Sequence, residues 1–224
     1  MTLRAAVFAS GRGSNFEVLA DHTQGADWTV AVLVSDRPDA PALDRARRRG
    51  IPVAVVPVKD RAVEDVGEET LGALREAAVD LCLLAGYLRL VPPRVVEAFR
   101  GRVLNVHPAL LPAFGGKGMY GLHVHRAVLE AGVRVTGPTV HFVDERYDRG
   151  RILAQWPVPV MEGDTPEGLA ARVTAVEHEL YPAAVDELAR ALSAGREPRT
   201  IPQGEVGHPR FHLRFEPEDT GRHR

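Results

Sequence analysis

Cysteine is almost absent from this chain of 224 residues, which contains one, Cys82. A single cysteine excludes an intrachain disulfide and a zinc site built on cysteines. A large excess of charge is absent as well, because 28 basic and 30 acidic residues give a formal net charge of −2. The chain therefore lacks the basic footprint of a nucleic-acid-binding protein. We predict no nucleic-acid partner and no metal site.

Long hydrophobic runs are also missing. No apolar stretch approaches the length of about 18 residues that spans a bilayer. The start, Met1-Thr2-Leu3-Arg4, leads into a short apolar run without the pattern of a cleaved signal peptide. We therefore predict no membrane association and a cytoplasmic location. What the chain does have is 45% hydrophobic residues, enough to bury a sizeable core.

Short apolar runs alternate with amphipathic segments in the first half of the chain. The runs predict strands at residues 5–9, 30–35, 53–58, 81–85 and 103–107, and the segments between them predict helices at residues 15–23, 41–49, 60–78 and 93–99. Continuously apolar strands are typical of parallel sheets covered on both faces. The alternation predicts an α/β fold with a doubly wound, mostly parallel, Rossmann-like sheet, in which ligands bind at the carboxyl ends of the strands.

The second half has a different pattern. Residues 123–132 predict a helix, and residues 133–143 and 151–160 predict an antiparallel two-stranded extension of the sheet. A long helical region follows at residues 165–192, which Pro182 is expected to interrupt or kink. We assign residues 1–195 to one domain. Prolines and alternating charges after it predict a weakly ordered C-terminal tail at residues 196–224.

A glycine-containing loop, Ser10-Gly11-Arg12-Gly13-Ser14-Asn15, follows the first predicted strand and opens a helix. Backbone N–H groups at a helix start favour an anion, so Gly13, Ser14 and Asn15 are candidates for phosphate binding. The loop matches neither the dinucleotide fingerprint nor the Walker A motif. A structural interpretation exists too, because Ser14 and Glu17 have the spacing of a capping box.

Two polar side chains, Asn105 and His107, end the last strand of the first half, and Pro108 follows them. Residues two apart in a strand face the same side, so these two side chains converge. A carboxamide beside an imidazole can polarise a carbonyl group and handle a proton. The alternative is a buried pair that only holds the following loop.

Other polar residues allow two interpretations each. His141 either supports the site or contacts a substrate directly, and Asp148 is either a catalytic carboxylate or part of an Asx turn. For Glu177, a solvated helix face is the simpler interpretation. The glycine-rich loop 115–118 is either a linker or a lid whose Lys117 meets an anion.

Five motifs together resemble one family, the folate-dependent phosphoribosylglycinamide formyltransferases. They occur in the family's order: Gly13-Ser14-Asn15, Asn105 to Pro112, Thr139 to Val143, Asp148-x-Gly150 and Glu177 to Pro182. The resemblance covers roughly residues 3–192. It implies transfer of a formyl group from the cosubstrate 10-formyltetrahydrofolate to the amine of glycinamide ribonucleotide, in de novo purine biosynthesis and without a metal. A homodimer is compatible with the sequence.

The resemblance also implies roles for individual residues. Catalysis falls to Asn105, His107 and Asp148. The implied substrate-binding residues are Gly13, Ser14, Asn15, Glu177 and Arg61. The implied folate-binding residues are Arg89, Leu90, Val91, Asn105, His141, Asp144 and Asp148. Many members have Asp-Gly-Gly where this chain has Asp148-Arg149-Gly150.

Three alternatives remain open beside this reading. Methionyl-tRNA formyltransferase shares the Asn-x-His and Leu-Leu-Pro elements, but it carries a C-terminal RNA-binding domain that we do not expect after Leu192. Formyltetrahydrofolate deformylase, a hydrolase, usually has an N-terminal regulatory domain, whereas the first predicted strand begins at about Leu3. The third alternative is a noncatalytic phosphate- or nucleotide-binding module that uses only the glycine loop.

Overall fold

The computed structural model describes residues 2–201. Its main sheet contains β1 (Leu3–Phe8), β2 (Trp28–Ser35), β3 (Val53–Val55), β4 (Leu81–Leu84), β5 (Val103–His107), β7 (Thr139–Phe142) and β8 (Ile152–Gln155). A separate small sheet contains β6 (Val135–Thr136) and β9 (Val158–Pro159). The helices are α1 (Ser14–His22), α2 (Pro41–Arg48), α3 (Val63–Glu76), α4 (Pro93–Ala98), α5 (Leu122–Glu130) and α6 (Pro166–Ser193).

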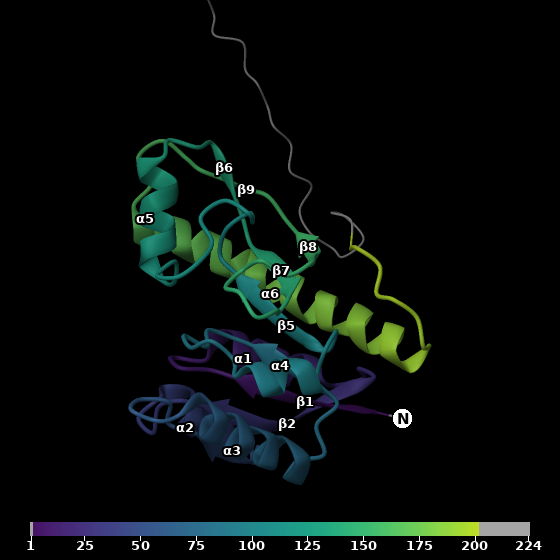
Figure 1. Cartoon of the computed structure of the whole chain (residues 1–224). Coiled ribbons are helices and arrows are strands. Elements are labelled where there is room, and N and C mark those ends of the chain that lie inside the picture. Colours follow the sequence, from purple (N-terminus) through teal and green to yellow (C-terminus); the bar gives the residue numbers. More distant parts are fainter. Residues whose placement is uncertain (1, 202–224) are drawn as a thin grey trace, which may run out of the picture.

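The main sheet has the strand order β3-β2-β1-β4-β5-β7-β8 (Figure 1). The first five strands in this order pair in parallel, β7 is antiparallel to β5, and β8 is antiparallel to β7. The predicted doubly wound, mostly parallel α/β fold is thus confirmed. From β1 the chain proceeds outward through β2 and β3, and β4 then starts on the other side of β1. This reversal is the topological switch point at which such sheets bind ligands.

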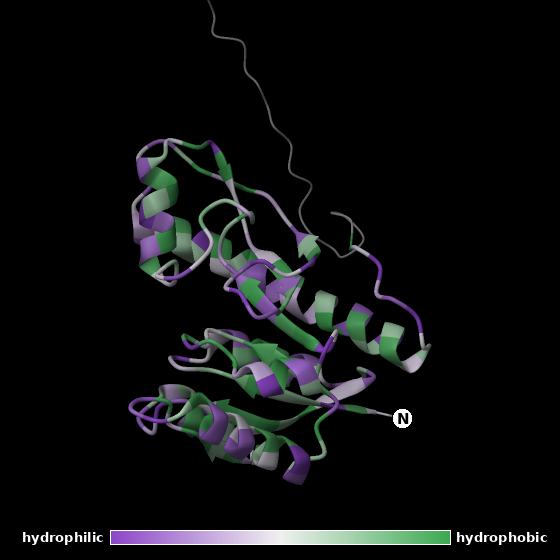
Figure 2. Ribbon diagram, in the orientation of Figure 1, coloured by the Kyte–Doolittle hydropathy of each residue, from purple (hydrophilic) through white to green (hydrophobic). Residues whose placement is uncertain are grey.

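Two hydrophobic cores lie on the two faces of the sheet. Successive residues of β1 alternate between them, so that Ala5 and Val7 belong to one core and Ala6 and Phe8 to the other. Helices α1, α2 and α6 complete the first core, and α3 and α4 complete the second. Burial on both faces explains why the strands are apolar throughout, as the hydropathy colouring of Figure 2 shows.

The antiparallel part differs from the prediction. The sequence predicts two continuous strands at residues 133–143 and 151–160, but each breaks in two. The breaks fall at Gly137-Pro138 and Trp156-Pro157, where the prolines lack the N–H that a ladder needs. A Cβ atom at Gly137 would lie 1.9 Å from the carbonyl oxygen of Trp156, so the two segments cross there too closely for a side chain. As a result β7 and β8 extend the main sheet, and β6 and β9 pair separately.

Helix α6 runs unbroken past Pro182, which lies inside it (Figure 1). Of the two predicted effects of this proline, an interruption of the helix does not occur. The residues on both sides of it, including Leu180, Tyr181 and Val185, are fully buried in the core. Packing of this apolar face stabilises the helix more than the lost backbone hydrogen bond destabilises it.

The predicted tail begins with residues that pack against the domain. Arg196 donates to Glu187 of α6 at 2.8 Å, and Ile201 is 8% exposed and bridges to Ala154 of β8. These contacts hold residues 196–201 against the fold, whereas residues 202–224 lie outside the described residues. Between residues 2 and 201, no helix is long and apolar enough to cross a membrane.

The buried hydroxyl of Tyr181 links α6 to the sheet and provides a test of this packing. It lies 3.1 Å from the carbonyl oxygens of Leu84 in β4 and Leu104 in the neighbouring strand β5. The substitution removes this hydrogen bond and keeps the ring, so Tyr181→Phe is expected to lower the free energy of unfolding by about 0.5–1.5 kcal/mol. Urea denaturation measures the change. Tyr147→Phe is the control, because Tyr147 is 39% exposed. Equal midpoints for the two variants would contradict the expectation.

Candidate active site

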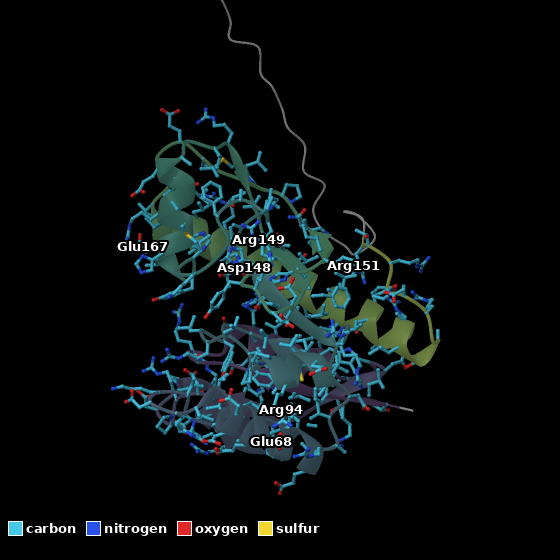
Figure 3. The ribbon with its side chains drawn as sticks, viewed as in Figure 1. Glu68, Arg94, Asp148, Arg149, Arg151 and Glu167 are labelled. Atoms are coloured by element: carbon cyan, nitrogen blue, oxygen red, sulfur yellow. The ribbon has the colours of Figure 1, made fainter. Side chains whose placement is uncertain are left out.

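A cavity of about 810 Å³ opens where the carboxyl ends of β1, β2, β4 and β5 meet. The glycine loop, residues 84–91, the end of β5 and the loop between β7 and β8 contribute its walls. Figure 3 shows Asp148 toward the middle of the molecule, and Glu68 and Arg94 on its far lower side. The cavity thus lies at the switch point of the sheet.

Four side chains that the sequence singles out meet in this cavity. Antiparallel pairing of β5 and β7 sets Asn105 opposite His141, and Asn105 Nδ2 lies 3.1 Å from His141 Nε2. Asp148 comes from the loop after β7. Its Oδ2 lies 3.6 Å from His107 Nδ1, and its Oδ1 lies 3.6 Å from His141 Nε2. The structure therefore brings the three predicted catalytic residues and His141 together.

Backbone carbonyls fix the tautomers of both histidines. His107 Nε2 lies 2.9 Å from the carbonyl oxygen of Phe114, and His141 Nδ1 lies 2.8 Å from that of Phe142. A carbonyl oxygen only accepts, so these nitrogens carry the protons. The other nitrogen of His107 then faces Asp148 and is free to gain a proton, and Nε2 of neutral His141 accepts an N–H from Asn105.

The electrostatics of His107 and Asp148 oppose each other. Burial lowers the pKa of His107, against the charge of Asp148, which raises it. Burial works to raise the pKa of Asp148, but the neighbouring His141 and His107 and the Gly116 N–H at 2.8 Å leave that pKa lowered. The arrangement holds an ionised carboxylate against an imidazole that is neutral at rest, and it stabilises the imidazolium once a proton arrives.

The loop carrying Asp148 depends on close backbone packing. Asp148 has a φ of 53°, in the left-handed region that non-glycine residues rarely adopt. Two residues on, a Cβ atom at Gly150 would lie 1.8 Å from the carbonyl oxygen of Phe142. This explains the glycine in the Asp-x-Gly motif. The middle residue, Arg149, is exposed and lies outside the cavity wall, so an arginine is accommodated there.

The glycine loop opens α1 without the predicted capping box. Gly13 is the N-cap residue with a φ of 79°, and no side chain caps the helix. Glu17 instead forms an ion pair with Arg45 of α2, so the capping-box interpretation was wrong. A Cβ atom at Gly13 would lie 2.7 Å from that of Ala42. Gly13, Ser14 and Asn15 all line the cavity, where free N–H groups at a helix start favour an anion.

Glu177 lies in the cavity wall rather than on a solvated helix face, so that simpler interpretation was wrong. The residue is 7% exposed, and its Oε2 accepts a hydrogen bond of 2.9 Å from Asn15 Nδ2. Burial raises the pKa of Glu177 to about 7, and the hydrogen bond from Asn15 opposes this rise. The glutamate is therefore coupled to the glycine loop and titrates near neutral pH.

Two residues that the resemblance implies for binding do not reach the cavity wall. The Arg61 side chain donates to the carbonyl oxygen of Pro57 and pairs with Glu69 at 2.7 Å. Asp144 accepts from the backbone N–H of Arg146 at 2.8 Å, which forms an Asx turn. Arg89, Leu90 and Val91 do line the cavity, and so does Lys117.

Asp36 and His125 also line the cavity, and neither is among the residues predicted from the sequence. His125 of α5 is 3% exposed, and burial, followed by the charge of His107, lowers its pKa. Asp36 directly follows β2, a place where doubly wound sheets present ligand contacts. A polar residue directly after a predicted strand could therefore have identified Asp36 from the sequence. Nothing in the neighbouring sequence distinguishes His125 from an ordinary helix residue.

Comparison with known proteins agrees with this geometry. The formyl transferase family matches residues 3–185. A fold of this topology with Asn105, His107 and Asp148 in one cavity defines the class, and the chain belongs to the formyl transferase family.

The relatives narrow the class. The chain is 52% identical to chloroplastic phosphoribosylglycinamide formyltransferase of Arabidopsis thaliana over 184 residues, 80% of this chain and 62% of that protein. It is 39% identical to phosphoribosylglycinamide formyltransferase of Bacillus subtilis over 186 residues, 82% of this chain and 93% of that protein. The crystal structure of glycinamide ribonucleotide transformylase 1 from Symbiobacterium toebii has a TM-score of 0.79 and 41% identity, covering 84% of this chain and 88% of that one. The resemblance to the phosphoribosylglycinamide formyltransferases is thus confirmed, although the match spans about 60% of the plant relatives' length.

The raised pKa of Glu177 gives a test of the burial of this carboxylate. The ordinary pKa of this carboxyl group is 4.5, and in the folded protein it is about 7. At a pH between these two values, Glu177 keeps its proton in the folded protein and loses it in the unfolded chain. The free energy of unfolding of the wild type therefore falls as pH rises through this range. Glu177→Gln abolishes this fall, because glutamine does not titrate. The stability of this variant relative to wild type should grow by on the order of 2–3 kcal/mol between pH 5 and pH 8.

Chemical denaturation across this pH range measures the difference. Glu179→Gln is the matched control, because Glu179 lies on the same helix and is exposed. If the Glu177→Gln and wild-type stability curves ran parallel, the carboxylate would not be buried in its neutral form.

Proposed function

We propose that this chain transfers the formyl group of 10-formyltetrahydrofolate to the amine of glycinamide ribonucleotide, a step of de novo purine biosynthesis. One observation carries the proposal: Asn105, His107 and Asp148 meet in the same cavity as the free N–H groups of the glycine loop. A carboxamide, an imidazole and a carboxylate suit acyl transfer to an amine. The anion site suits a phosphate ester that carries this amine.

The phosphate end of the acceptor supplies binding energy at a distance from the reaction. Gly13, Ser14 and Asn15 hold the phosphate, and Glu177, fixed by Asn15, accepts hydrogen bonds from the ribose hydroxyls. Such contacts, made away from the reacting atoms, orient the amine toward the carbon of the formyl group. Their binding energy also offsets the translational and rotational entropy that is lost when two reactants come together.

Asn105 and His107 act on the group that is transferred. One N–H of Asn105 is directed to His141, and its second N–H is available to the formyl oxygen as negative charge develops there. His107 takes up a proton at Nδ1, where Asp148 stabilises the imidazolium, and returns one to the departing nitrogen. Asp148 relays protons as the amine loses one.

The polarity of the cavity wall supports a folate cosubstrate. Leu88, Leu90 and Tyr147 line it and are 44%, 40% and 39% exposed, unusually so for large apolar residues. An exposed apolar wall beside a few polar groups is typical of sites for flat aromatic ligands such as a pteridine. Arg89 lies in the same wall and offers a cation to an acidic tail.

The proposal includes a cellular setting and an assembly. We propose that the enzyme works in the cytoplasm, which a single cysteine suits, and acts on small molecules without a nucleic-acid partner, a metal or a membrane. A homodimer is its proposed assembly. The two plant relatives are named chloroplastic, so fractionation of cells that express the chain is the test of location.

Substitution of the catalytic side chains tests the reaction. Losing one donor to a developing oxyanion typically lowers turnover on the order of 10²–10³-fold, so Asn105→Ala should do so. Losing a general acid–base group typically costs on the order of 10²–10⁴-fold, so His107→Ala should be comparably severe. The assay follows release of tetrahydrofolate from formyl-folate in the presence of glycinamide ribonucleotide. Arg94→Ala is the control, because Arg94 is exposed and pairs with Glu68 away from the cavity (Figure 3).

The same assay separates the alternatives. A deformylase would release tetrahydrofolate with water as acceptor, at a rate independent of glycinamide ribonucleotide. A noncatalytic module would bind a phosphate ester with the same affinity in wild type and His107→Ala, and would release nothing. Near-normal turnover in both alanine variants would contradict the catalytic roles proposed for Asn105 and His107.

A further inference from the structure

Asp36 is a buried carboxylate in the cavity wall that the reaction above does not use. It follows the carboxyl end of β2, and its side chain is 2% exposed. Its Oδ2 accepts a hydrogen bond of 3.0 Å from Nε of Arg89. Its Oδ1 is buried and has no hydrogen-bond partner within residues 2–201. Half of this carboxylate is therefore unsatisfied by the protein.

A buried carboxylate oxygen without a donor is destabilising, and native proteins rarely leave one. Since Asp36 lines the cavity, a molecule bound in the cavity is placed to supply the missing donor. A ligand that fits must therefore present an N–H or O–H group at this point of the wall.

Arg89 adds a second requirement at the same point. Its side chain is 50% exposed, and among residues 2–201 only Asp36 engages it, at Nε. Because the guanidinium group is planar, a bond at Nε fixes the direction of the two remaining nitrogens. An arginine held in this way loses little side-chain freedom when it binds a carboxylate.

We propose that Asp36 determines specificity for the cosubstrate, by holding Arg89 in place and by accepting an N–H from the ligand. Together the two residues recognise an acylated amino acid, in which an amide N–H lies next to a carboxylate. This inference rests on the proposed function, because the glutamyl end of 10-formyltetrahydrofolate is such a group. Asp36 acts on binding of that end and takes no part in proton transfer.

The experiment compares two cosubstrates, 10-formyltetrahydrofolate and 10-formyltetrahydropteroate, which lacks the glutamyl group. With the first, Asp36→Ala is expected to raise KM about tenfold or more with kcat within about twofold, as loss of a charged hydrogen bond predicts. With the second, both constants should stay at wild-type values. Asp36→Asn keeps an acceptor oxygen and the shape of the side chain, so its KM should rise less.

Two further variants serve as controls. Asp39→Ala removes the same charge from the same loop, but Asp39 is exposed, pairs with Arg37 and lies outside the cavity wall, so both constants should be unchanged. In an Arg89→Gln background, Asp36→Ala should raise KM by a smaller factor than in wild type, because the two residues act together.

A fall in kcat/KM by the same factor with both cosubstrates in Asp36→Ala and Asp36→Asn would overturn the proposal, because Asp36 would then support the site as a whole. An unchanged KM with the complete cosubstrate would overturn it as well. Calorimetric binding of tetrahydrofolate and tetrahydropteroate to each variant gives a readout without catalysis. If wild type bound both but transferred no formyl group, the proposed function would fail separately from the role of Asp36.

Discussion

The antiparallel pairing of β5 with β7 is the interaction on which the site depends. It places His141 beside Asn105, and the loop after β7 then returns to β5 and brings Asp148 to within 3.6 Å of His107. The close backbone contact at Gly150 holds the loop against β7, so that the positions of all four side chains follow from one strand pair.

Buried carboxylates share the cavity, and their neighbours decide what each one does. Two histidines and a backbone N–H keep Asp148 ionised despite burial, which suits a group that must stabilise an imidazolium. In the described part of the chain the partner of the Glu177 carboxylate is the amide of Asn15, so burial raises the pKa of Glu177 to about 7 and leaves it able to donate as well as accept. Asp36 is paired with Arg89. The same functional group is therefore proposed to serve proton transfer, substrate contact and ligand selection.

Local patterns in the sequence predicted the structure correctly where no contact with a distant segment opposed the local preference. Apolar runs of strand length predicted the parallel sheet, and the two-residue period of a strand placed Asn105 and His107 on one face. The errors fall where distant segments compete with a local rule. Pro182 lies inside a helix because the residues on both sides of it pack in the core. Glu17 does not form the capping box because it forms an ion pair with Arg45 of α2 instead. Glu177 looked solvated because its neighbours in space, not in sequence, bury it.

By itself the sequence determined the α/β class, the glycine loop at the start of α1 and the paired polar side chains at the end of β5. These follow from hydrophobic periodicity and from the backbone preferences of glycine and proline, which act over a few residues. Only the tertiary structure decided that Asp148 and His141 join His107, that Arg61 and Asp144 stay outside the cavity, and that Asp36 belongs to its wall. Distances between residues far apart in the chain, together with burial and the pKa shifts that burial causes, arise only when the sheet is assembled.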